Sequence, residues 1–128
     1  MTTESALPTA LLLIAHGSRR QEANEDLDYL AEQLRARGRF AFVQKSFLEL
    51  TEPTIAAGGA LCVSAGARRI IMLPYFLSAG VHVHEDLQAA RRDLATHFPQ
   101  VEFRLARPLG PHPLLVELVA QRAEEVFG

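Results

Sequence analysis

The chain has 128 residues, of which 48% are apolar and 22% are charged, a composition typical of a folded globular protein rather than a disordered one. This length fits one domain, residues 1–128, which buries roughly two-thirds of the surface of the unfolded chain. The formal net charge is −2 and there is no basic tract. This argues against nucleic acid as the main partner, because binding phosphates requires clustered lysines and arginines.

The single cysteine and the first residues of the chain indicate the compartment. Cys62 is the only cysteine, which excludes an intramolecular disulfide and a thiolate-rich zinc site within one chain, and favours a reducing environment. The apolar run at residues 10–15 is too short for a signal peptide or a membrane span, and no basic segment precedes it. We therefore expect a cytoplasmic protein without a membrane partner, in which residues 1–9 form a flexible extension.

Eight segments of alternating character follow one another along the chain. Short apolar runs predict strands, and apolar residues at helical spacing predict helices that begin near proline or end at glycine. The stripe of the first helix includes Ala23 and Leu27, and Cys62 lies on the stripe of the second. In chain order we expect a strand at 10–15, a helix at 23–38, a strand at 40–48, a helix at 53–66 with Pro53 in its first turn, a strand at 69–73, a helix at about 83–98, an edge strand at 101–105 and a helix from Pro113.

This order predicts an α/β fold with a four-stranded parallel sheet and helices on both faces, because right-handed crossovers join parallel strands in this way. Ligands of such sheets bind beyond the carboxyl ends of the strands. Four loops therefore form the candidate site, at residues 16–20, 49–53, 74–84 and 108–113.

His16 directly follows the first strand, and Gly17 lets the chain turn so that the imidazole can face the sheet crevice. Taken alone, His16 is explained equally well as a solvated loop residue. A histidine phosphatase also places His-Gly after its first strand, but its chemistry requires an arginine just before the histidine, where this chain has Ala15. Glycine-rich phosphate loops are absent from the sequence as well, so phosphoryl transfer is a minor alternative.

Two glutamates follow the second strand. Glu52 has a local explanation, because an acidic residue just before a helix interacts favourably with the helix dipole. Glu49 is a stronger candidate as a metal ligand or proton partner, since it lies near the crevice between two leucines. His112, between two prolines at a helix start, and His97, late in a helix, are also explained locally.

Residues 74–87, PYFLSAGVHVHEDL, combine an apolar loop, small residues and two histidines. We interpret Phe76 and Leu77 as exposed apolar residues of this loop, which suit a large, flat, hydrophobic ligand. His82 and His84 could chelate one ion together if the backbone were extended, but their rings diverge by about 200° in a helix. Acidic residues just after His84 favour the helix, so His82 is the candidate and His84 is at most an auxiliary contact.

Together these motifs resemble the small class II chelatases, the sirohydrochlorin cobaltochelatase and ferrochelatase family. The likeness runs from about Leu11 to the C-terminus and departs from the family after Asp86, where Leu87-Gln88 replaces the usual Ile-Pro. The four motifs that carry it are His16-Gly17-Ser18-Arg19; Phe47-Leu48-Glu49 with Glu52-Pro53; Pro74-Tyr75-Phe76-Leu77 with Gly80-x-His82-x-x-x-Asp86; and Leu109-Gly110-x-His112-Pro113.

The resemblance implies a single chelatase half that acts as a lyase and inserts cobalt, iron or nickel into sirohydrochlorin without ATP, on the routes to cobalamin or sirohaem. It implies that His16 and His82 are catalytic, that both bind the metal together with Glu49, and that no cofactor is needed beyond the metal substrate. A homodimer is also implied. The implied tetrapyrrole contacts are Glu52, Leu77, Ser78, Ala79, Gly80, Val81 and His82.

Imidazole chemistry agrees with this interpretation. A neutral ring nitrogen binds Co²⁺, Fe²⁺ or Ni²⁺, and it can also accept a pyrrole proton at neutral pH. An incomplete set of protein ligands suits a metal that must be released, whereas a saturated site holds its metal as a structural ion. A non-catalytic metal or tetrapyrrole carrier with the same cleft remains the alternative, and ligand type does not decide between the metals.

Overall fold

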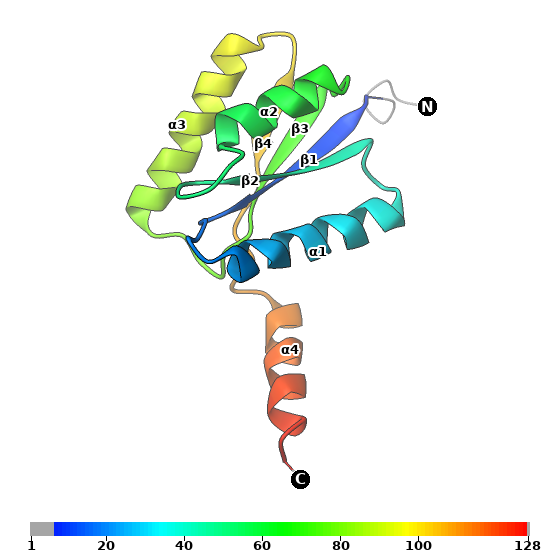
Figure 1. Ribbon diagram of the computed structural model, residues 1–128, viewed down its shortest axis with the longest axis vertical. Coiled ribbons are helices and arrows are strands. Elements are labelled where there is room, and N and C mark those ends of the chain that lie inside the picture. The colour runs from blue at the N-terminus through cyan, green and yellow to red at the C-terminus, as the bar shows by residue number, and fades with distance from the viewer. Residues whose placement is uncertain (1–6, 128) are drawn as a thin grey trace.

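The computed structural model describes residues 7–127 and has the predicted order of elements (Figure 1). Its four strands form one parallel sheet in the order β2-β1-β3-β4, so the last strand lies at an edge, as its alternating pattern predicted. The elements are β1 (Thr9–Ala15), α1 (Gln21–Arg37), β2 (Phe42–Phe47), α2 (Ile55–Ser64), β3 (Arg69–Pro74), α3 (Val81–His97), β4 (Glu102–Leu105) and α4 (Pro113–Glu124).

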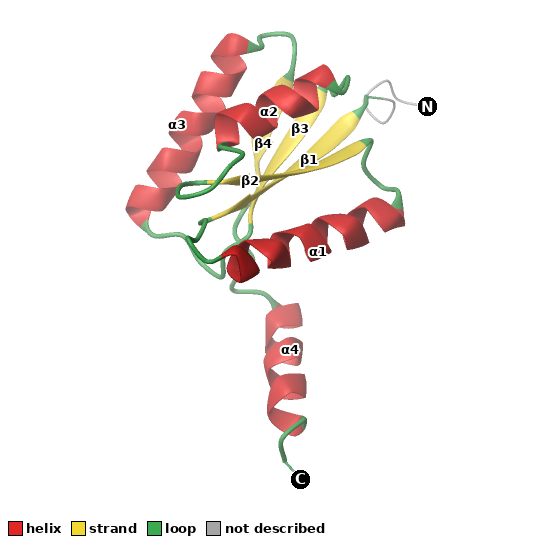
Figure 2. Ribbon diagram, in the orientation of Figure 1, coloured by secondary structure: helices red, strands yellow, loops and turns green. Residues whose placement is uncertain are grey.

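Helices cover both faces of the sheet, as expected (Figure 2). Helix α1 packs over β1 and β2 on one face, while α2 and α3 pack on the opposite face over an apolar cluster that includes Cys62 and Phe76. Strand β1 is nearly inaccessible to solvent, which accounts for its continuous apolar run, whereas β3 alternates buried with partly exposed residues. Glycine ends α1 as predicted, because Gly38 adopts the left-handed conformation with φ of 67°.

Three helices begin at other residues than predicted. Helix α1 begins at Gln21, two residues before the expected start at residue 23. Helix α2 begins at Ile55 rather than at Pro53, because the Thr54 hydroxyl caps the helix by accepting a hydrogen bond of 3.1 Å from the Ala57 N–H. Helix α3 begins at Val81, two residues earlier than expected.

Helix α4 begins at the predicted proline but packs on neither face of the sheet. It extends from the carboxyl edge of the sheet away from the rest of the chain (Figure 1). None of the residues Pro113–Glu124, all of which the structure describes, is buried. The alternation of strands and helices predicts that such a helix exists, but here it does not cover the strands that precede it.

The ends of the chain are described only in part. Residues 1–6, which belong to the predicted extension 1–9, lie outside the described residues, while Thr9 is already the first residue of β1. Within residues 7–127 no helix is long and apolar enough to cross a membrane.

Candidate functional site

The loops at the carboxyl edge are joined by backbone hydrogen bonds that continue the sheet beyond its strands. The loop after β2 donates to the loop after β1, because the Glu49 N–H binds the His16 carbonyl oxygen at 3.1 Å. The loop after β3 is joined to β1 in the same way, with the Tyr75 N–H 2.7 Å from the Ile14 carbonyl oxygen. The predicted site loops therefore form one continuous rim, visible as green segments at this edge in Figure 2.

His16 is exposed, and its ring stacks on Phe76 with 4.2 Å between the ring centroids and 25° between the planes. Phe76 is only 6% exposed and belongs to the apolar core. Our interpretation of Phe76 as an exposed ligand contact is therefore wrong. Because the chain turns after β3, this side chain enters the core and presents one ring face to the histidine, while Leu77 points outward and is 67% exposed.

Gly17 allows the first two loops to approach each other. It has a φ of 96°, and a Cβ atom at this position would collide with the carbonyl oxygen of Glu49. Only glycine fits both the backbone conformation and the space. Gly17 therefore forms the turn that the sequence predicted and also lets the backbone of Glu49 lie beside His16.

Asn24 holds the His16 loop from behind, and sequence reasoning missed it. Its side chain is buried and makes two hydrogen bonds to Ser18, accepting from the N–H at 3.0 Å and donating to the carbonyl oxygen at 2.8 Å. The predicted stripe assigned this inward position to Ala23, which is exposed. The available signal was a polar residue three positions before Leu27, on the same side of the helix, since a buried polar side chain is normally hydrogen-bonded.

The two glutamates of the second loop are both exposed. Between them Leu50 has a φ of 69°, which is uncommon for a residue with a side chain, and it is 54% exposed. The Glu52–Pro53 peptide bond is cis.

The third loop leads into α3 through Gly80, the N-cap residue. His82 lies in the first turn of the helix and is exposed; it does not precede the helix, as the predicted boundary had placed it. His84 is helical too, and its N–H donates to the Gly80 carbonyl oxygen at 2.9 Å. The prediction that a helix separates the two histidines is thus confirmed.

The side chains of His16, His82 and Glu49 do not form a preassembled metal site. Within residues 7–127, no three histidine, cysteine, aspartate or glutamate side chains are close enough together to hold an ion. The assignment of these three residues stays a prediction, and it describes a site that the ion and the macrocycle would complete.

The fourth loop is fastened to the third. Leu109 and Gly110 donate backbone hydrogen bonds of 2.9 and 2.8 Å to the carbonyl oxygens of Phe76 and Leu77. His112 then caps α4, because its Nδ1 accepts a hydrogen bond of 3.0 Å from the Leu114 N–H. This agrees with the local explanation of His112 as a helix-start residue.

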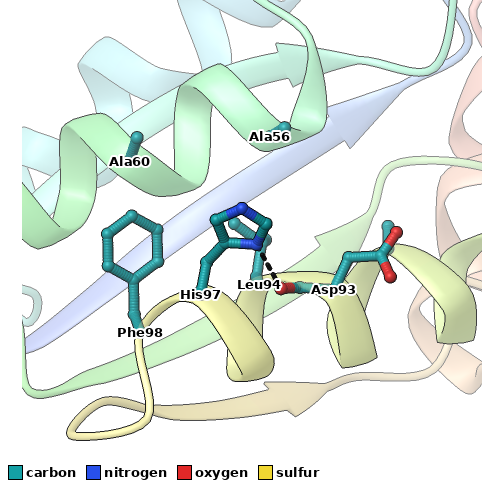
Figure 3. Close-up of a pocket in the computed structure, with 7 residues that line it drawn as sticks. Ala56, Ala60, Asp93, Leu94, His97 and Phe98 are labelled. Atoms are coloured by element: carbon teal, nitrogen blue, oxygen red, sulfur yellow. Dashed lines mark hydrogen bonds between the residues drawn. The ribbon is translucent and has the colours of Figure 1, made fainter.

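An apolar groove of about 390 Å³ lies between α2 and α3, away from the predicted site residues (Figure 3). Its polar members offer little chemistry, since His97 Nδ1 is 3.2 Å from the Asp93 carbonyl oxygen and the Asp93 carboxylate points away from the ring. The groove therefore contains none of the predicted site residues, which lie at or near the carboxyl edge of the sheet. The residues that line the groove are Ala56, Ala60, Ala90, Asp93, Leu94, His97 and Phe98.

The sequence profile of the CbiX family matches residues 10–126. The chain belongs to the CbiX family. This CbiX chain is 34% identical over 114 residues to the chloroplastic sirohydrochlorin ferrochelatase of Arabidopsis thaliana, a match that covers 89% of the chain and 51% of the relative.

Two solved structures share its fold. The sirohydrochlorin chelatase SirB of Bacillus subtilis subspecies spizizenii, solved in complex with cobalt, has a TM-score of 0.86 and 29% identity over 94% of this chain and 51% of SirB. A CbiX protein of Marinobacter aquaeolei VT8 has a TM-score of 0.79 and 28% identity, over 92% of this chain and 96% of that protein. The chain thus spans about half the length of the plant relative and of SirB, but nearly all of the Marinobacter protein.

Proposed function

We propose that this CbiX chain is a sirohydrochlorin metal chelatase, a lyase that inserts cobalt, iron or nickel without ATP. The observation that carries the proposal is the exposed His16, held against Phe76 at the carboxyl edge, beside the backbone of Glu49 and an exposed apolar loop. The names of the plant ferrochelatase and of cobalt-bound SirB support the same activity. The product would serve the routes to cobalamin or sirohaem.

In this proposal His16 accepts a pyrrole proton and binds the incoming metal, and His82 is a second ligand. Glu49 supplies a carboxylate that binds the ion or receives the proton. All three residues are exposed, so the ion can exchange between protein and macrocycle. A loose set of two imidazoles and a carboxylate binds a divalent ion reversibly, which insertion requires.

The macrocycle would lie on the exposed part of the third loop. Leu77 and Val81 are 67% and 72% exposed and offer an apolar surface to its plane. Gly80 lets the plane approach the backbone. The exposed side chains of Arg19 and Arg20 are donors for its carboxylates. The proposed contacts are Glu52, Leu77, Ser78, Ala79, Gly80, Val81 and His82.

We further propose that residues 1–128 form one chelatase-like domain that acts as a cytoplasmic homodimer. The free, buried thiol of Cys62 suits a reducing compartment. Two copies of this chain would together match the length of SirB, of which one copy covers 51%. In this proposal the reaction needs no cofactor other than the metal ion that it inserts.

An insertion assay with sirohydrochlorin and Co²⁺, followed by absorption spectra, tests the proposal. We expect His16→Ala and His82→Ala each to lower kcat/KM at least about 100-fold, because each removes a ligand or proton acceptor. His84→Ala, on a different side of the same helix, is the matched control and should retain near-normal turnover. Unchanged rates in either of the first two variants contradict the assignment, and stoichiometric binding without insertion favours the carrier.

A further inference from the structure

Leu50 is held in a costly backbone conformation in the loop that follows β2. Its φ of 69° lies in the left-handed region, and around it the Thr51 N–H donates a hydrogen bond of 2.9 Å to the Glu49 carbonyl oxygen. A three-residue turn with a positive central φ is rare, because it strains any residue that has a Cβ atom. Glycine or asparagine adopts a positive φ at a lower cost than leucine does.

The side chain of Leu50 does not belong to the apolar core. It is 54% exposed and is part of neither apolar cluster of residues 7–127, whereas Leu48, two positions earlier, packs against the core. A single exposed leucine is ordinary on a protein surface, but an exposed leucine in a strained turn is not. Burial in the core therefore does not account for a large apolar residue at this position.

Backbone hydrogen bonds fix the loop on both sides of Leu50. At the base of the loop the Phe47 N–H donates to the Pro53 carbonyl oxygen at 2.9 Å. Nearer the turn, the N–H groups of residues 48 and 49 donate to carbonyl oxygens at the end of β1, at 2.9 and 3.1 Å. Backbone strain persists where the surrounding structure fixes it, and strained residues gather at ligand sites. The loop thus presents the Leu50 turn in one place, beside the end of β1.

The sheet topology places Leu50 and the exposed apolar loop after β3 on either side of His16. Strand β1 lies between β2 and β3, so His16 at its carboxyl end is flanked by the loop of Leu50 and the loop of Leu77. Both flanking loops lead to helices on the same face of the sheet, α2 and α3 (Figure 1). Two strand spacings, roughly 10 Å, separate β2 from β3. A flat four-ring macrocycle can therefore contact both loops with its centre at His16.

We propose that Leu50 packs on the plane of the tetrapyrrole and positions it from the β2 side, opposite Leu77. The inference rests on the proposed chelatase function and adds a substrate contact to it. Leucine has no atom that binds a metal ion or accepts a proton, so this contact serves the macrocycle alone. An apolar side chain suits the ring plane rather than the peripheral carboxylates. The strain of the turn is then offset in the complex, where the side chain leaves water.

Binding of metal-free sirohydrochlorin, followed by its fluorescence, tests the contact. We expect Leu50→Gly to raise the dissociation constant about tenfold, because the exposed part of the leucine side chain no longer becomes buried. Leu50→Met keeps an apolar side chain and should change the constant less than about threefold. Leu61→Ala is the matched control, since it shortens a similarly exposed leucine on α2 and should leave the constant unchanged. Equal constants for Leu50→Gly and the wild type overturn the proposal.

Urea unfolding separates a substrate contact from a structural role. We expect the urea midpoint of Leu50→Gly to be no lower than that of the wild type, because relief of the positive φ offsets the greater freedom of glycine in the unfolded chain. In the insertion assay the same variant should raise the KM for sirohydrochlorin about tenfold and change kcat less than about threefold. A midpoint that falls together with the affinity shows that Leu50 supports the fold, and it overturns the proposal.

Failure of this inference can be told apart from failure of the proposed function. A wild-type chain that binds and metallates sirohydrochlorin, with unchanged affinity in Leu50→Gly, overturns the contact alone. A wild-type chain that does not bind sirohydrochlorin overturns both. Sedimentation equilibrium tests a second copy of the chain as the other occupant. If Leu50→Gly weakens a dimer and leaves the affinity for sirohydrochlorin unchanged, Leu50 is a subunit contact and the proposal is overturned.

Discussion

At the scale of single residues, the exposed imidazole of the proposed site depends on a buried neighbour. Phe76 is anchored in the core and stacks on His16, whose own loop is otherwise held by backbone bonds and by Asn24. Stacked rings restrict the rotamer of a side chain that solvent would otherwise leave free. A reacting group that is misplaced by about 1 Å can lose up to about 100-fold in rate.

We predict that Phe76→Leu lowers kcat for metal insertion roughly tenfold while changing the KM for sirohydrochlorin less than about threefold. The ring of His16 loses its stacking partner, but the exposed apolar loop that meets the macrocycle is unchanged. Phe76→Tyr keeps the ring and should restore most of kcat. Steady-state kinetics of the three proteins measure both constants.

Loss of stability alone would also slow the enzyme, so Phe103→Leu serves as the control. Phe103 belongs to the same apolar cluster, is also 6% exposed, and lies on β4. It should lose comparable stability in urea without losing kcat. Equal losses of kcat in the two leucine variants would show that Phe76 does not position the histidine.

At the scale of elements, α4 depends on its cap more than the other helices do, because its own chain offers it no packing. The His112 ring accepts the N–H of Leu114, one of the donors that a helix start leaves unsatisfied. Helices α1, α2 and α3 are instead held by apolar contacts with the sheet.

We predict that His112→Ala accelerates hydrogen exchange of the backbone amides at the start of α4 roughly fivefold, because losing an N-cap costs about 1 kcal/mol. Asparagine is a good N-cap residue, so His112→Asn should exchange nearly as slowly as the wild type. Mass spectrometry of the segment 113–124 measures the rates. Identical rates in the alanine variant and the wild type would mean that the cap contributes nothing.

At the scale of the whole molecule, the buried thiol of Cys62 makes the stability of the fold depend on pH. It lies on α2 facing the sheet, is fully buried, and burial raises the pKa of its thiol from 9.0 to about 12. Folding therefore holds the thiol neutral in a range of pH where the unfolded chain ionises it. This contribution to stability is fully present below pH 9 and is lost as pH rises from about 9 towards about 12.

We predict that the free energy of unfolding of the wild type falls more steeply between about pH 8 and pH 10.5 than that of Cys62→Val, which has no ionisable group there. Valine is apolar and similar in volume, so the core is otherwise preserved. Urea titrations of both proteins at each pH measure the difference. Parallel curves would show that the thiol does not ionise on unfolding, contrary to its burial.

Much of the fold follows from local patterns. Continuous apolar runs predicted the central strands, and Gly38 and Pro113 predicted the end of α1 and the start of α4. The site loops were predicted too, since parallel strands bring their carboxyl ends to one edge. The likeness of the four loop motifs to the chelatases led to the family, which the CbiX match confirms.

Packing between distant segments is what the patterns left undetermined. The alternation of apolar residues does not tell that Phe76 turns inward to stack on His16, or that Asn24 rather than Ala23 faces the loop. Nor does the amphipathic pattern of α4 tell which surface it covers. These features depend on which side chains and backbone groups meet once the sheet has formed, and residues far apart in the sequence decide them together. The sequence by itself thus determined the elements, their order and the edge at which the proposed site lies. The tertiary structure decided how the loops of that proposed site are held, and that α4 does not pack on the sheet of its own chain.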